Sequence, residues 1–318
     1  MSISTMIPSP CRVFGALPSF LVLALMAGQV SAAPRAAYVD DHFACRAQPL
    51  PAVVLHLTGD AWKLDSKGKA HPLQEGMTID EQEGVRTSES AFTSLLLGDG
   101  SRVVLPSSSQ MRLHLVPGQS IPQVILEQGQ AEAYVIKRAS DHDRFQIVTP
   151  VGVLGVRGTH FRVRDDAGQS VLEVLNGQVA VNRDVNMKRG PVEDEVKVGA
   201  RQGLLFTKQG DLKPVELLPA PVLIGQDGLK GDAPVWHLYL QPLPGAQRYR
   251  AQVATDTAFL NIKQQNFSSE PKMSFTGLKA SFYHVRLSAY DEHGLEGETG
   301  VYDIFYYPPA TQAQATGG

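Results

Sequence analysis

Short apolar runs broken by turn residues cover most of the chain from Val53 onwards. Between Val53 and Leu218, β-branched and aliphatic residues alternate with polar ones, and Gly, Asp-Gly or Pro interrupts them about every eight to twelve residues. This stretch shows almost no helical periodicity. The pattern predicts an all-β domain over residues 51–216.

The clearest single element is a hairpin over Ser94–Leu105. Two apolar runs flank Asp99-Gly100, a dipeptide suited to a turn that needs a positive φ. Pro106 ends the second strand, because proline has no N–H for the ladder. We expect Asp99, Gly100 and Ser101 to be structural residues of this turn.

A weak internal repeat indicates how the strands could be stacked. Gly59, Gly129 and Gly177 each stand two positions before a small or β-branched residue. A strand entered through a glycine bend, repeated along the chain, predicts a β-solenoid or roll. A β-sandwich would give a similar pattern, and the unequal spacing of the three glycines makes the repeat degenerate.

A proline-rich joint at residues 217–222 precedes a second region of different composition. Aromatic residues become frequent beyond it, and strands are predicted at 235–240, 249–255, 272–276, 283–291 and 302–306. Their spacing predicts a small antiparallel β-sandwich over residues 223–308. A polar, flexible tail follows at 309–318.

The N-terminal segment has the pattern of a secretory signal peptide. A mostly apolar run from Val13 to Ala27 is followed by Val30-Ser31-Ala32, a small-residue cleavage site. We expect cleavage near Ala32, which removes residues 1–32 and leaves a linker at 33–50. The protein is then periplasmic or secreted, with no stable membrane span. A retained anchor is the alternative, although the run is shorter than the ~20 residues that cross a bilayer.

Charge and cysteine content exclude several classes of function. The 318 residues are 43% hydrophobic and carry a net charge of −3, so the chain lacks the cationic footprint of a nucleic-acid binder. Cys11 lies inside the predicted signal peptide, which leaves Cys45 without an intramolecular partner. Cys45 stands in a short polar stretch, where an inert thiol is favoured over a nucleophile.

The most distinctive segment is Phe145–Val163, where an alternating strand is followed by glycines and polar residues. Gly155 and Gly158 permit bends or close backbone contact. Arg157, between these glycines, could bind backbone carbonyls or a carboxylate and so fix the bend.

The polar residues of this segment have two interpretations. Arg157, Thr159 and His160 could form a cluster that binds an anion, or they could brace the bend. Bracing is favoured, because His160 and Arg162 alternate outward while their neighbours face inward.

Several segments taken together resemble the FecR domain family. The matching stretches are Gly84–Leu95, the Asp99-Gly100-Ser101 turn, Thr149–Val163 and Val174–Val181, which contains Gly177. They cover residues 84–183 and imply an extracytoplasmic β-domain. Pro244–Val253 is similar to a fibronectin type III-like module often carried by exported FecR-domain proteins. FecR regulators of siderophore systems also have a cytoplasmic anti-sigma region and a transmembrane helix, which the predicted signal peptide replaces here.

No catalytic or metal-binding pattern occurs along the chain. The nine histidines are scattered, and HExxH, G-x-S-x-G and P-loop motifs are absent from the sequence. His142, between Asp141 and Asp143, could be a metal ligand or a base, but the arginines around it favour a solvated charge cluster. We therefore expect no catalytic residue, no cofactor and no metal ion.

The two tryptophans could serve a core or a ligand. Trp236 opens the first predicted strand of the second region, where a core position is favoured and stacking on a sugar is the alternative. Trp62 has the same two interpretations.

Two functions follow from these patterns. The preferred one is a non-enzymatic interaction protein of the periplasm or cell envelope, which docks proteins or peptidoglycan glycans through strand edges and loops. The alternative is an envelope signal relay that acts on a membrane regulator of sigma-factor activity. An envelope hydrolase ranks third, and the oligomeric state is open.

Overall fold

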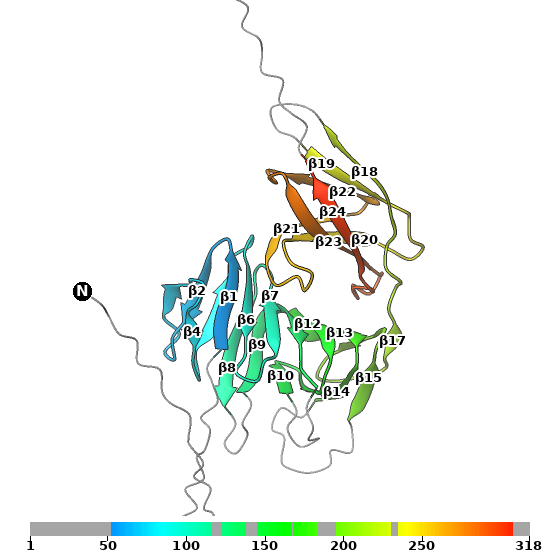
Figure 1. Ribbon diagram of the computed structural model, residues 1–318. Coiled ribbons are helices and arrows are strands. Elements are labelled where there is room, and N and C mark those ends of the chain that lie inside the picture. Colours follow the sequence, from blue (N-terminus) through cyan, green and yellow to red (C-terminus); the bar gives the residue numbers. More distant parts are fainter. Residues whose placement is uncertain are drawn as a thin grey trace, which may run out of the picture. The chain divides into compact units, whose positions relative to one another are not determined.

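The computed structural model confirms the all-β class (Figure 1). It describes residues 52–115, 122–137, 145–166, 168–183, 195–229 and 235–307. The predicted signal peptide, linker, Cys45, His142 cluster and tail lie outside these residues. The described residues form 24 strands and no helix. Among them, therefore, no helix has the length and apolarity to cross a membrane.

Strands β1 to β17 form a first module with two hydrogen-bonded sheets that share β9. Sheet A has the order β4 (Thr78–Ile79), β1 (Ala52–Thr58), β6 (Phe92–Leu96), β7 (Arg102–Leu105), β9 (Pro122–Tyr134), β12 (His160–Asp166), β13 (Gln169–Asn176), β16 (Gln202–Phe206) and β17 (Val215–Glu216). Sheet B has the order β3 (Ala70–Pro72), β2 (Ala61–Leu64), β5 (Gly84–Thr87), β8 (Gln110–Leu115), β9, β10 (Phe145–Thr149), β11 (Gly152–Val156), β14 (Gln178–Asn182) and β15 (Val196–Gly199). The first module therefore consists of two sheets joined by one long strand. The finer prediction of a solenoid or roll is not confirmed.

The glycines of the weak repeat lie where the chain passes from one sheet to the other. Gly59 links β1 to β2, Gly129 lies inside β9, and Gly177 links β13 to β14. Their φ angles are 76°, 82° and 88°, a region that residues with a Cβ rarely adopt. The repeated glycines therefore mark the points where the chain crosses from one sheet to the other, which we call sheet crossings.

Gly177 provides a direct test of this requirement. A Cβ there would lie 2.7 Å from Gly158 O and 2.8 Å from Thr159 Oγ1. We expect Gly177→Ala to lower the free energy of unfolding by about 2–3 kcal/mol, since backbone strain and overlap add. Gly168→Ala is the matched control, because φ is +86° but nothing lies within 4 Å of its Cβ. Equal losses in the two variants, measured by urea unfolding, would contradict the close-contact explanation.

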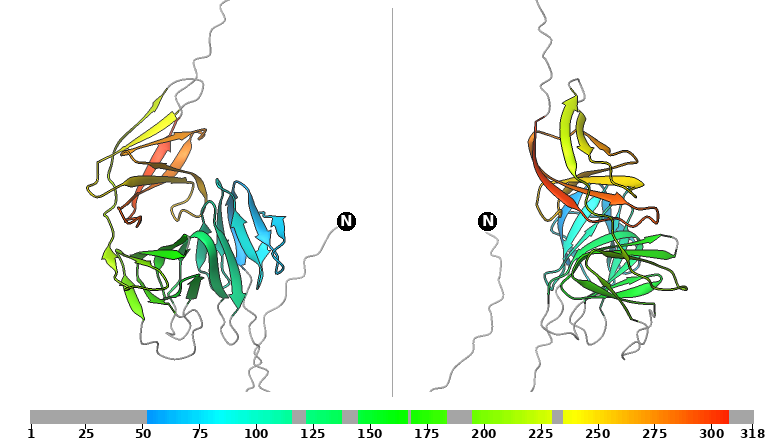
Figure 2. Two further views of the ribbon diagram at one scale, coloured as in Figure 1. Left: turned by 180° about the vertical axis from the view of Figure 1, so that it is seen from behind. Right: turned by 90° about the vertical axis from the view of Figure 1, so that its right-hand side faces the viewer.

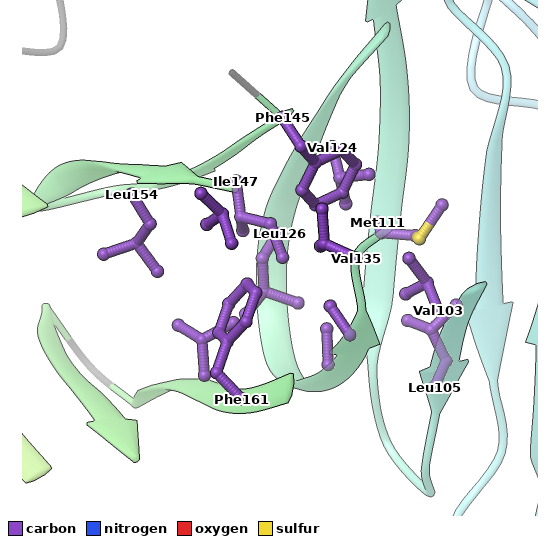
Figure 3. Packing of buried hydrophobic residues seen from close by; sticks show 14 of the residues in the cluster. Val103, Leu105, Met111, Val124, Leu126, Val135, Phe145, Ile147, Leu154 and Phe161 are labelled. Carbon is purple, nitrogen blue, oxygen red and sulfur yellow. The ribbon is translucent and has the colours of Figure 1, made fainter. Parts of the chain in front are cut away.

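One apolar core fills the space between sheets A and B (Figure 3). Val103, Leu105 and Phe161 point inward from sheet A and meet Met111 and Ile147 of sheet B. All five are at most 1% exposed. Because side chains alternate along a strand, the residues between them on sheet A point away from this core.

The predicted hairpin is present as β6 and β7. Ser94 pairs with Val104, and Gly100 takes the expected positive φ of 88°. The Asp99 carboxylate accepts hydrogen bonds from Ser101 N at 3.0 Å and Ser101 Oγ at 2.7 Å. Ile136 N donates to the same hydroxyl at 3.3 Å. The turn is thus tied to the end of β9, and its polar residues have a structural role.

Strands β18 to β24 form a second module (Figure 2). This module has its own hydrophobic core. One sheet has the order β18 (Leu223–Leu229), β19 (Val235–Leu240) and β22 (Lys272–Thr276). The other has the order β21 (Ile262–Ser268), β20 (Arg248–Ala254), β23 (Ser281–Tyr290) and β24 (Gly300–Tyr306). The five predicted strands are present within two residues at each end. β18 and β21 were not predicted, because glycines interrupt the first and amide side chains fill the second.

Candidate functional site

The FecR-like segment braces two sheet crossings against each other. Thr159 Oγ1 donates to Gln178 O at 2.9 Å and lies 3.3 Å from Gln178 N. Gly158, with φ +65°, has no room for a Cβ beside Lys137. Gly155 lies mid-strand in β11, paired with Gln146 and Ala180, so the bend falls at Gly158. Thr159 therefore has the bracing position of the favoured interpretation.

His160 reaches a buried carboxylate that also binds the second module. Its Nε2 lies 2.7 Å from Glu132 Oε1, and its ring stacks on Tyr134 with 4.1 Å between centroids. Arg286 of β23 donates to both oxygens of Glu132, at 2.5 and 2.6 Å. Gln252 Oε1 accepts from Nε of the same guanidinium at 2.9 Å. This bidentate pair joins β9 to β23.

Arg162 makes a second contact between the modules. Its Nη2 donates to the carbonyls of Glu296 and Gly297 at 2.8 and 2.7 Å. Its Nη1 lies 2.8 Å from Glu296 Oε1, an ion pair without hydrogen-bond geometry. Arg162 points away from the core of the first module, as predicted, but it does not reach solvent. The side chain is 0% exposed because the second module covers it.

Glu296, in the loop between β23 and β24, is the centre of this second contact. Besides Arg162, its carboxylate accepts from Arg250 Nη1 at 2.9 Å, from Tyr290 Oη at 3.0 Å and from Ser288 Oγ. Its backbone N–H donates to Glu173 Oε1 at 3.1 Å. One loop residue is thus bound by strands of both modules.

The strand register explains why these charges meet. On the outer face of sheet A, Arg162 is paired with Glu132 on one side and Glu173 on the other, a row of alternating charge. On the facing sheet of the second module, Arg250 pairs with Ser288 and Arg286 with Gln252. Two outer sheet faces therefore meet through a buried ionic network, defined here as Glu132, Arg162, Glu173, Arg250, Arg286 and Glu296.

Apolar contacts flank the ionic network at both ends. Phe92 and Val104 of the first module pack with Phe259 and Ile262 of the second. At the other end Val171, Leu217 and Leu295 form a smaller cluster. These contacts keep water from the ion pairs and strengthen them by lowering the local dielectric constant.

The three carboxyl groups of the network differ in pKa. Burial opposes ionisation of Glu132, but Arg286 and His160 outweigh it and hold the pKa well below its ordinary value. Burial is likewise outweighed at Glu296, where Arg162 and Arg250 lower the pKa to about 2. Burial dominates at Glu173 and raises its pKa to about 7, with the nearby Glu296 charge adding to the rise. Arg162 approaches Glu173 only to 3.9 Å, so Glu173 is the least compensated acid.

Stability should depend on pH through Glu173. A carboxyl group whose pKa rises on folding destabilises the folded protein when it is ionised. The folded protein is therefore most stable with respect to Glu173 below pH 4.5, the ordinary pKa, where the group is protonated in both the folded and the unfolded protein. The free energy of unfolding should fall as the pH rises from about 4.5 to about 7, by up to about 3 kcal/mol. Glu173→Gln should remove this fall in stability. The amide oxygen still accepts the hydrogen bond from Glu296 N, but the amide does not titrate between pH 4.5 and 7. Urea unfolding between pH 5 and 8 measures it.

A control variant and the pH dependence below 4.5 complete the test of Glu173. Glu216→Gln changes an exposed carboxylate of the same module and should leave the slope unchanged. Below pH 4.5 the sign reverses, since Glu132 and Glu296 lose their contribution as the pH falls towards their lowered pKa values. An unchanged slope between pH 5 and 8 in Glu173→Gln would contradict the assignment.

The other candidate residues lie outside the network. Arg157 is partly exposed in the turn between β11 and β12. Trp236 is 2% exposed and stacks on Tyr306 at 4.8 Å, so the structure places it in the core of the second module. Trp62 is partly buried, with Arg86 over its ring at 5.1 Å. Among the described residues, no group of three His, Cys, Asp or Glu is placed to hold a metal ion.

A comparison with protein families identifies part of the chain. A family model described as "FecR protein" matches residues 83–180. Residues 83–180 are a FecR domain. The domain contains Glu132, Arg162 and Glu173, so it supplies half of the ionic network. The match covers less than half of the 318 residues, and no curated protein matches the chain.

Solved structures similar to this chain are distant. A candidate anti-sigma factor from Parabacteroides distasonis is 18% identical, with a TM-score of 0.35, over 42% of this chain and 59% of its own. The extracellular domain of a candidate one-component system from B. thetaiotaomicron is 12% identical, with a TM-score of 0.18, over 69% of this chain and 36% of its own. The chain thus spans less than two thirds of these proteins, and scores this low carry no argument about fold or function.

Sequence reasoning did not find the partners of the FecR domain. Glu132, Arg250 and Arg286 each stand between two apolar residues of a strand, a pattern typical of any strand with one solvated face. The sign of the charges gave no signal, because each module contributes both glutamate and arginine to the network. The pattern along one strand does not reveal which outer faces meet.

Proposed function

We propose that this protein is a non-enzymatic interaction protein of the periplasm or cell envelope, in which the FecR domain and the second module act as one rigid body. The buried ionic network carries the proposal. Its three carboxylates and three guanidiniums are each at most 4% exposed. Burial of charges is tolerated only when they are paired, so the network requires docked modules. Arg162 of the FecR domain binds the second module directly, and His160 contacts the Glu132 carboxylate that binds Arg286, so we assign both residues a structural role.

We also propose that the second module is fibronectin type III-like. Its seven antiparallel strands form a three-stranded and a four-stranded sheet around one core, which fits a β-sandwich of this class. Modules of this kind present loops and strand edges to partners, which is the mode of action proposed here.

A groove between the modules is the proposed docking place. It has a volume of about 480 Å³ and is lined by polar groups of both modules, among them Glu89, Ser90, Ser107, Lys263 and Gln265. Gln265 Oε1 also accepts from Arg250 at 3.0 Å, so the groove borders the ionic network. Hydroxyl, amide and charged groups at the mouth of a groove of this size suit a glycan or an extended peptide.

A binding experiment tests the docking function. Purified peptidoglycan and envelope extract should each be offered to the wild-type protein and to Lys263→Glu. We expect capture by the wild type and about tenfold weaker binding by Lys263→Glu, about 1.4 kcal/mol. Lys208→Glu, an equal charge change at an exposed site away from the groove, should bind like the wild type. Failure of the wild type to capture either material, or release of soluble fragments from peptidoglycan, would overturn the proposal.

The FecR domain itself favours a second candidate function, the relay of an envelope signal to a membrane regulator of sigma-factor activity. The same experiment separates the two. Capture of peptidoglycan or of secreted proteins supports docking, whereas selective capture of the periplasmic part of a sigma-factor regulator supports relay.

Export is part of the proposal and has its own test. Mass spectrometry of the protein from the native host should find a mature N-terminus just after Ala32. An intact Met1 would contradict export by a cleaved signal peptide.

A further inference from the structure

Exposed apolar side chains gather on one hairpin of the second module. Phe282, Val301, Phe305 and Tyr307 are 49%, 52%, 65% and 71% exposed. Phe282 of β23 lies directly opposite Phe305 of β24, on the outer face of the four-stranded sheet. We call these four residues the hairpin patch. The paired His284 and Asp303 lie between Val301 and the Phe282–Phe305 pair, so the continuous apolar part of the patch is aromatic. Exposed apolar patches mark contact surfaces.

The patch lies on an edge strand. In the described part of the chain β24 pairs only with β23. Its start is covered by the joint between the modules, because Tyr302 Oη accepts from Leu223 N at 3.0 Å and donates to Pro221 O at 3.3 Å. From Asp303 to Tyr307, no described strand pairs with the outer edge.

Between Asp303 and Tyr307 this uncovered edge has no lysine, proline or bulge, and Pro308 and Pro309 follow it in the sequence. Edge strands are normally guarded by lysine, proline, a bulge or an inward-pointing charge. Asp303 is the only charged residue between Asp303 and Tyr307, and its carboxylate is 2.6 Å from His284 Nδ1. The β23–β24 register shows no shift. A flat apolar edge of this kind is a template for another strand.

We propose that a second copy of this chain pairs with this edge, β24 against β24, antiparallel about a two-fold axis at Phe305. In this register the uncovered stretch pairs along its full length with itself. Phe305 faces the Phe305 of the second copy, and Asp303 faces Tyr307, whose hydroxyl can donate to the carboxylate. No like charges are placed opposite each other, and the cross-strand pair of Phe282 and Phe305 extends into a row of four aromatic rings.

The position of the patch supports a copy of the same chain as the occupant. The hairpin patch lies on the same outer sheet face as Arg286, which is paired with Val301 in the register. Arg286 binds Glu132 of the FecR domain, so the patch is continuous with an interface that this face already makes. A two-fold pairing closes the assembly at two copies, so it uses the edge without open-ended growth. The four-stranded sheets of the two copies would form one continuous sheet.

The mass of the purified protein in solution tests the pairing. We expect sedimentation equilibrium to give twice the mass of one chain, with dissociation on dilution. Phe305→Lys should raise the dissociation constant at least about tenfold, because it removes the central ring and places like charges opposite each other. Ile224→Lys is the matched control: Ile224 is 63% exposed on β18, in the other sheet, and the change should leave the mass unaltered.

A cross-link tests the register. In a Cys11→Ser/Cys45→Ser background, Phe305→Cys should form a disulfide-linked dimer under mild oxidation, since the two-fold axis brings the two side chains together. Ile224→Cys should not. A wild-type protein that is monomeric at every concentration, or a dimer that Phe305→Lys leaves intact, would overturn the proposal. So would a monomer that instead binds an unrelated strand along β24.

Discussion

Arg286→Met should lower the free energy of unfolding by about 3–5 kcal/mol, the cost of removing one partner of a buried ion pair. The guanidinium makes two short hydrogen bonds to Glu132 and two to Gln252, at 2.9 and 2.5 Å. Methionine fills a similar volume, so the loss comes from leaving the Glu132 carboxylate buried without its cation. His160 and the Tyr134 hydroxyl, which donates to Glu132 Oε1 at 3.1 Å, then remain beside that carboxylate, but Arg286 has left it.

A matched control separates this effect from a general loss of arginine. Arg248→Met removes an exposed arginine from β20 that stacks on Phe267 at 4.0 Å, and should cost less than about 1 kcal/mol. Combining Arg286→Met with Glu132→Leu should recover part of the loss, because no unpaired charge remains. Urea unfolding at pH 7 measures all four proteins. An Arg286→Met loss no larger than that of the control would contradict a structural role for the pair.

Glu296→Gln should have an effect of similar size, about 3–5 kcal/mol, because it leaves two buried guanidiniums without their shared anion. Arg162 and Arg250 lie 2.8 and 2.9 Å from the carboxylate oxygens. The amide keeps the shape of the side chain, and its oxygen still accepts from one donor. The effect is therefore one of charge.

The control for Glu296→Gln lies in the same loop. Glu292 has a side chain 77% exposed, and Glu292→Gln should change the free energy of unfolding by less than about 0.5 kcal/mol. The Glu296→Gln loss should also shrink as the pH falls towards 2, where the wild-type carboxylate itself becomes protonated. A loss that stays constant between pH 7 and pH 3 would show that charge is not the cause.

Much of the fold could be predicted from local patterns. The Asp99-Gly100 turn, the strands with alternating apolar residues and the glycines at sheet crossings all act through neighbours in sequence. β18 and β21 were missed because Gly225 and Gly228 interrupt the first, and Gln264, Gln265 and Asn266 give the second a polar composition. Tertiary packing holds these two strands in place, and single-sequence patterns do not report it.

The candidate site was largely beyond sequence reasoning. The sequence pointed to Thr159 and His160 as polar residues near a bend, but the carboxylate that His160 contacts is bound by Arg286, more than a hundred residues away. Arg162 contacts Glu296, which is 134 positions further along the chain. Outward-facing charges look the same in sequence whether water or another sheet covers them.

The coincidence of two unfolding probes tests the central claim, that the two modules are one rigid body, most directly. The chain has two tryptophans, Trp62 in the first module and Trp236 in the second. In Trp62→Phe, fluorescence reports the second module alone, while far-UV circular dichroism reports the strands of both. We predict a single urea transition with the same midpoint by both probes at pH 7. Two separated midpoints would show that the modules unfold independently and would contradict the claim.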